Sequence, residues 1–83
     1  MSKVALVTGA SRGIGRAIAL RLAADGCAVG VNYASNSAKA EEVVEQIVAG
    51  GGRAISIKAD VGDEDQVNDM FTTVSEALGP VTI

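Results

Sequence analysis

A glycine-rich segment near the start of the chain constrains the fold more than any other feature. Residues 8–15 read Thr-Gly-Ala-Ser-Arg-Gly-Ile-Gly, and they follow a short apolar run over residues 3–8. That run is typical of a strand buried on both faces, and a helical pattern begins after the glycines. The segment therefore predicts a tight strand-to-helix turn whose small residues allow another group to approach the backbone.

The same alternation of strand and helix continues along the chain. Residues 28–33 and 54–58 have the composition of two further strands. The first helix is expected to end at Gly26 and to bury one apolar face, formed by Ile14, Ala17, Ile18 and Leu22. The second helix is expected to start at a Ser35 or Ser37 cap, to end at residues 50–52, and to bury Ala40, Val43, Val44, Ile47 and Val48.

A third helix is predicted where Asp63 is followed by Gln66, which is the spacing of a capping box. Its apolar stripe is formed by Val67, Met70, Phe71, Val74 and Leu78. Gly79 and Pro80 end that helix, and residues 81–83 predict a fourth strand.

The order β-α-β-α-β-α-β predicts an α/β protein with a three-layer, doubly wound parallel sheet. Strand order 3-2-1 with the fourth strand beside the first would leave much of one sheet face uncovered. We therefore expect residues 1–83 to be the N-terminal part of a single dinucleotide-binding domain whose remainder lies outside this chain. The alternative is a small domain that dimerises to cover its sheet.

Composition excludes several kinds of site. The chain has no histidine and one cysteine, which excludes a Cys/His zinc site and an internal disulfide; no metal ligand set is predicted. A net charge of −3 and 2% aromatic residues argue against nucleic-acid binding. No apolar run is long enough for a signal peptide or a membrane span, so a cytoplasmic protein is expected.

The charge around the glycine-rich turn indicates an anion. Arg12 and Arg16 lie at the predicted helix start, where cations oppose the helix dipole, and no acid precedes Asp25. A bound phosphate would supply the missing negative charge. The spacing is Gly-x3-Gly-x-Gly, unlike a P-loop, and a plain tight turn without a ligand is the alternative interpretation.

The end of the second strand bears on the choice of dinucleotide. NAD sites usually place an acid about 20 residues after the glycines, to bind the ribose hydroxyl. Residues 30–37 contain no acid, which together with Arg12 favours NADP(H) over NAD(H), and Ser35 adds a hydroxyl donor. After the third strand, Asp60 has two interpretations: it accepts a hydrogen bond from the adenine amino group, or it belongs to the turn before Asp63.

Three segments together resemble the short-chain dehydrogenase/reductase family: Thr8–Gly15, Asn32-Tyr33 and Ala59-Asp60-Val61. Within it, residues 31–47 are most similar to the 3-oxoacyl-[acyl-carrier-protein] reductases. The resemblance implies a Rossmann fold, a nicotinamide cofactor and often a homotetramer. It also implies that the diphosphate and 2′-phosphate are lined by Gly9, Ser11, Arg12, Gly13, Ile14 and Gly15, that Asn32 and Tyr33 flank the adenosine, and that Asp60 and Val61 contact the adenine.

The family's catalytic residues have no counterpart in this chain. Tyr33 is the only tyrosine and is followed by Ser37, so it does not form the Tyr-x-x-x-Lys pair, and Cys27 has no histidine to activate it. We therefore predict that the 83 residues alone are inactive. The resemblance implies that the whole protein reduces a carbonyl substrate, either a small molecule or an acyl-carrier-bound thioester. A glucose or alcohol dehydrogenase and a non-catalytic NADP-binding fragment are the alternatives.

Overall fold

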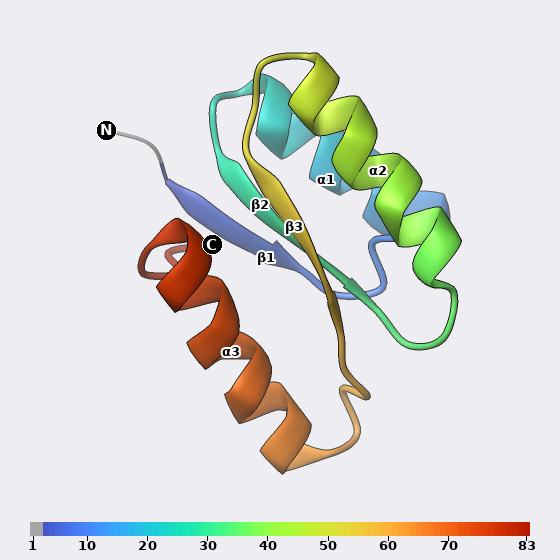
Figure 1. The fold of residues 1–83 in the computed structure, drawn as a ribbon, viewed down its shortest axis with the longest axis vertical. Helices are drawn as coiled ribbons and strands as arrows, with labels where there is room; N and C mark the ends of the chain where they lie inside the picture. The colour runs from blue at the N-terminus through green and yellow to red at the C-terminus, as the bar shows by residue number, and fades with distance from the viewer. Residues whose placement is uncertain (1–2) are drawn as a thin grey trace.

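The computed structural model describes residues 3–83, which form one parallel sheet between two layers of helices (Figure 1). Helices α1 and α2 cover one face of the sheet, and α3 lies against the other (Figure 1). The strands are β1 (Val4–Val7), β2 (Ala28–Tyr33) and β3 (Ala54–Lys58), and the helices are α1 (Gly13–Ala24), α2 (Ser37–Ala49) and α3 (Glu64–Leu78). Both pairings are parallel, and β2 lies between β1 and β3, as predicted.

The central strand β2 divides the core into two clusters. Val29 and Val31 are fully buried and pack toward α1 and α2, whereas Ala28 packs toward α3. This follows from the alternation of side chains along a strand, and both faces are apolar because both are covered by helices. On the α3 side, the buried side chains of Val74 and Met70 form the centre of the smaller cluster.

The fourth strand expected over residues 81–83 is not formed, because the sheet of residues 3–83 has three strands. The segment nevertheless lies beside β1. Thr82 and Ile83 both donate backbone hydrogen bonds to the Val4 carbonyl, at 2.9 and 3.2 Å, and Leu6 donates to the Ile83 carbonyl at 3.0 Å. Since two N–H groups share one carbonyl, the regular spacing of a parallel ladder is not established in so short a segment.

The predicted apolar face of α1 is wrong at Ile14, Ala17 and Ile18 and correct at Leu22. Ile14 is 80% exposed and Ile18 is 46% exposed, whereas Ala19 is fully buried. Besides Leu22, the helix packs through Ala19 and, in part, through Leu20 and Ala23. The helix is rotated because Gly15 lies directly against the turn before it: a Cβ on Gly15 would overlap the Gly9 carbonyl oxygen and lie 3.2 Å from the Ala10 Cα. Small size, rather than hydrophobicity, therefore selects the face of α1 that meets the sheet.

Side chains cap α2 and α3 but not α1. The N-cap of α2 is Asn36, whose Oδ1 accepts from the Lys39 N–H at 3.1 Å, and so neither Ser35 nor Ser37 is the cap. The predicted cap of α3 is confirmed: Asp63 Oδ1 accepts from the N–H groups of Asp65 and Gln66, at 3.0 and 3.3 Å. At α1 the N-cap residue is Arg12, which makes no capping hydrogen bond.

Gly30 on β2 allows α3 to approach the sheet closely. A Cβ at Gly30 would lie 3.0 Å from Val74 Cγ2 and 3.2 Å from Leu6 Cδ1, both in packed parts of the protein. We expect Gly30→Ala to lower the free energy of unfolding by about 1–3 kcal/mol, the usual cost of overpacking a core. Urea unfolding of the protein expressed from its complete reading frame, called the full-length protein below, measures this change.

Gly50→Ala is the matched control, since its added methyl group would meet only ordinary contacts, 3.6 Å from the Gln46 and Ile47 carbonyl oxygens. We expect this variant to unfold at the wild-type urea concentration or above it. Equal unfolding free energies for Gly30→Ala and the wild type would contradict the close packing of α3 on β2.

Candidate functional site

The carboxyl ends of the three parallel strands carry the residues that the sequence singled out. The turns that follow β1, β2 and β3 emerge at the same edge of the sheet, where open α/β sheets bind ligands. A cavity of about 240 Å³ lies between the first two turns and is lined by Gly9, Ser11, Arg12, Ala34, Ser35 and Asn36. The structure thus brings together four of the predicted site residues, which are Gly9, Ser11, Arg12 and Ser35.

The start of α1 is an uncompensated positive end. Its first turn contains no acid and its N-cap residue forms no side-chain cap. Within residues 3–83 the only ion pair joins Arg21 to Asp25 at the other end of the same helix, at 3.4 Å. The exposed Arg12 and the half-buried Arg16 therefore lie beside the positive end of the helix dipole without a carboxylate partner among the described residues.

The three glycines of the turn have two different structural roles. Gly9 and Gly13 have left-handed backbone angles, with φ of 59° and 61°, and a Cβ on either would project into open space. Gly15 has no such requirement; it is needed because the helix backbone lies against the Gly9 carbonyl. The open space above the first two glycines leaves the turn accessible to a diphosphate, and so these residues fit the dinucleotide that the sequence predicts.

Asn32 is buried, with 2% of its surface exposed. Its Oδ1 accepts from the Gly9 N–H at 3.1 Å, and its Nδ2 donates to the Ile57 and Ala59 carbonyls at 3.3 and 3.2 Å. The side chain therefore holds the site together from within, a role that the sequence analysis missed. The available signal was an amide inside an otherwise apolar central strand. Contact between Asn32 and an adenosine stays a prediction.

Asp60 takes part in the turn before α3. Its Oδ1 accepts from the Gly62 N–H at 2.9 Å, and its own N–H donates to Gln66 Oε1 at 2.8 Å. This is the turn role that the sequence left open, and contact with an adenine amino group stays a prediction. Val61, beside it, is 57% exposed, which leaves an apolar surface at the end of β3.

Ile14 and Tyr33 complete the predicted set. Ile14 lies in the first turn of α1 and is largely exposed, whereas Tyr33 is half-buried and packs against the core between the sheet and the α1–α2 layer. The two side chains therefore differ in how much surface they offer to a ligand at this edge.

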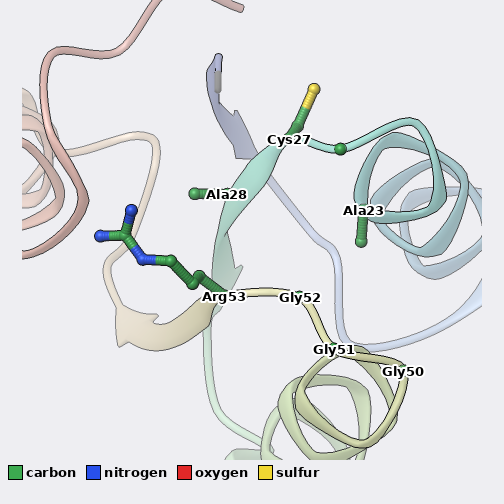
Figure 2. A pocket seen from close by; sticks show the side chains of 8 residues that line it. Ala23, Cys27, Ala28, Gly50, Gly51, Gly52 and Arg53 are labelled. Carbon is green, nitrogen blue, oxygen red and sulfur yellow. The ribbon is translucent and has the colours of Figure 1, made fainter. Parts of the chain in front are cut away.

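Other hollows lie at the opposite edge of the sheet. The one in Figure 2 has a volume of about 190 Å³ and is lined largely by small residues, among them Ala23, Cys27 and Gly50–Gly52. The Arg53 guanidinium extends away from the three glycines and from Cys27 (Figure 2). Because this hollow lies at the amino ends of β2 and β3, it is not at the edge where parallel sheets bind ligands, and we place the candidate site at the cavity beside Arg12.

A parallel sheet of this strand order, with a glycine-rich turn at the end of its first strand, defines a Rossmann-type α/β protein. Residues 3–83 match the short chain dehydrogenase family, and the chain belongs to that family. It is 52% identical over its whole length to the 3-oxoacyl-[acyl-carrier-protein] reductase FabG of Staphylococcus epidermidis. The chain spans 34% of that relative's length.

Two solved structures extend the likeness to three dimensions. A dehydrogenase/reductase from Sinorhizobium meliloti superposes with a TM-score of 0.93 at 44% identity, covering 98% of this chain and 32% of the other. The promiscuous reductase LugOII, which catalyses keto-reduction at C1 during lugdunomycin biosynthesis, superposes with a TM-score of 0.84 at 51% identity, covering 92% of this chain and 31% of the other. Among residues 3–83, no helix is long and apolar enough to cross a membrane.

The contact between α1 and its preceding turn predicts that replacing Gly15 by alanine destabilises the protein, unlike the same replacement elsewhere in a helix. In an ordinary helical position, alanine is more favourable than glycine by about 1 kcal/mol. We expect Gly15→Ala to do the reverse and to lower the free energy of unfolding by about 1–3 kcal/mol, because the methyl group would displace the Gly9 carbonyl. Thermal and urea unfolding of the full-length protein measure the change.

The control for Gly15→Ala is Ala17→Gly, at an exposed position of the same helix. There we expect the ordinary order, with a loss of about 1 kcal/mol on replacing alanine by glycine. Stabilisation by Gly15→Ala would show that α1 does not depend on close contact with the Gly9 carbonyl.

Proposed function

We propose that the full-length protein is an NADP(H)-dependent oxidoreductase and that residues 1–83 form the N-terminal part of its single dinucleotide-binding domain. One observation carries the proposal. The cavity at the carboxyl edge of the sheet lies between the uncapped start of α1, with Arg12, and the turn after β2, which contains no acid. The other two helices have their N-termini capped by Asn36 and Asp63. A bound diphosphate would satisfy the positive end that the chain itself leaves uncompensated.

The residues of the glycine-rich turn would hold the diphosphate. Small residues at Gly9 and Gly13 keep the backbone accessible, and the first N–H groups of α1 have no intrahelical acceptor. The nicotinamide ring, when bound, would accept or supply a hydride. Ile14, which is exposed in the first helical turn, would offer apolar surface to the nucleotide, and Val61 would do so on the adenine side together with Asp60.

Selection of NADP(H) over NAD(H) would come from Arg12 and Ser35. Both line the same cavity, and its other lining residues are uncharged. A guanidinium there would attract the 2′-phosphate of NADP(H), whereas an acid, as usual in NAD sites, would repel it. Tyr33 and the backbone of Asn32 would flank the adenosine at the end of β2, while the buried Asn32 side chain faces inward.

The substrate class rests on the relatives. Relatives 52% identical to this chain are named 3-oxoacyl-[acyl-carrier-protein] reductases, which supports a 3-oxoacyl thioester as the substrate. Its reduction to the 3-hydroxyacyl form, as a step of fatty acid synthesis, is part of the proposal. A cytoplasmic homotetramer is part of the same proposal. A different carbonyl substrate is the second candidate, because a reductase 51% identical to this chain is described as promiscuous and acts in the biosynthesis of another compound.

The proposed role of Arg12 predicts a selective loss of affinity. We expect Arg12→Ala in the full-length protein to weaken NADPH binding by roughly 10- to 150-fold, the value of one charge-assisted hydrogen bond, and to change NADH binding little. Arg21→Ala is the matched control: Arg21 is exposed on the same helix but pairs with Asp25 at its far end. Calorimetric titration with both nucleotides measures the difference, and equal losses for NADPH and NADH would refute the 2′-phosphate contact.

The proposed activity predicts what the complete reading frame contains. We expect a Tyr-x-x-x-Lys pair beyond residue 83, and NADPH oxidation by the full-length protein in the presence of a 3-oxoacyl thioester. Substitution of that tyrosine by phenylalanine is expected to remove turnover and to leave NADPH binding intact. A reading frame without the pair, or NADPH binding without turnover of any carbonyl substrate, would favour a non-catalytic binding protein.

A further inference from the structure

Asn32 is the only buried polar or charged residue within residues 3–83. Burying an amide is unfavourable unless its hydrogen-bonding groups are satisfied, and here they are. Both Nδ2 hydrogens are donated to carbonyls at the end of β3, and Oδ1 accepts from the turn after β1. The backbone carbonyl of Asn32 also accepts from the Ala10 N–H at 2.9 Å.

The position of Asn32 in the sheet explains why an amide is needed there. The last paired residues of β1 and β2 are Val7 and Val31, whereas β2 and β3 remain paired through Tyr33 and Lys58. At Asn32 the first strand has therefore left the sheet to form the glycine-rich turn. There the Asn32 side chain links the two segments on either side of β2. Its Oδ1 accepts from the Gly9 N–H after β1, and its Nδ2 donates to the Ile57 and Ala59 carbonyls at the end of β3.

We infer that Asn32 is a positioning residue that holds the glycine-rich turn at a set distance from the segment carrying Asp60 and Val61. This inference rests on the proposed function, in which the first segment binds the diphosphate and the second binds the adenine. The side chain acts from inside the protein: it is buried and its donors are occupied. Asn32 thus governs affinity for the dinucleotide as a whole and does not discriminate between NADPH and NADH.

Asn32→Leu tests this inference with an uncharged side chain of similar size, which neither attracts nor repels the 2′-phosphate. The leucine removes the acceptor for the Gly9 N–H and both donors to the Ile57 and Ala59 carbonyls. We expect NADPH and NADH affinities of the full-length protein to fall by the same factor, about ten-fold or more. We also expect faster amide hydrogen exchange in residues 8–15 and 59–62, measured without nucleotide.

Val31→Ala is the matched control, because Val31 is the preceding, fully buried residue of the same strand and contributes packing without side-chain hydrogen bonds. It is expected to lower stability while leaving both nucleotide affinities and the exchange of residues 8–15 unchanged at temperatures where the protein is folded. If Asn32→Leu does not fold, Asn32→Ser, which retains one hydroxyl donor and acceptor on a shorter side chain, is measured in the same way and is expected to show the same parallel losses.

Two outcomes would overturn the inference. If an Asn32 variant is less stable but its nucleotide affinities and the hydrogen exchange of residues 8–15 are unchanged, Asn32 contributes only to stability. A fall in NADPH affinity with NADH affinity retained or raised would show that the side chain at position 32 faces the ribose. Failure of the proposed function is distinguishable, because the wild-type protein would then bind neither nucleotide, while the exchange measurement would still report whether Asn32 holds the turn.

Discussion

The close approach of α1 to the turn that precedes it is the constraint on which the rest of the site depends. The Gly15 backbone lies against the Gly9 carbonyl, and the Gly9 N–H is bound by Asn32 on the inner side. Together these contacts set the direction of the helix axis relative to the sheet. They also determine which backbone groups face the protein interior and which face the cavity at the carboxyl edge.

The electrostatic character of that edge differs between its two ends. The α1 start combines the positive end of a helix with Arg12 and no acid, whereas the α3 start is capped by Asp63 and has Glu64 and Asp65 in its first turn. Among residues 3–83, the dipole of α3 is thus compensated by acidic side chains, and that of α1 is not. This difference in charge would suit the proposed cofactor, with its diphosphate at the α1 start and its uncharged adenine ring near the α3 start.

Much of the fold follows from local sequence, and the exceptions have physical reasons. The bounds of β2 and the Asp63 cap of α3 are correct because alternation and capping are short-range properties. The face of α1 is mispredicted at Ile14 and Ile18 because these are more apolar than Gly15 and Ala19, yet Gly15 lies against the turn and Ala19 is buried in the core. The Asn36 cap depends on where the chain turns after β2, and the periodicity of α2 does not encode that.

The candidate site shows the same division. Gly9, Ser11, Arg12 and Ser35 are predicted from the sequence because a motif and a missing acid mark them, and the structure places them around one cavity; their contact with a nucleotide stays a prediction. The inward orientation of Asn32 depends on three segments far apart in the chain, so no local pattern contains it.

The buried amide also limits how the parts of this fold can be exchanged. A chimera that imports residues 8–15 from another protein, or that replaces the end of β3, must still match the hydrogen bonds of Asn32 on β2. The glycine-rich loop is therefore not a transferable module by itself. Its smallest transferable unit comprises the loop, the carboxyl end of the central strand and the carbonyls that follow β3.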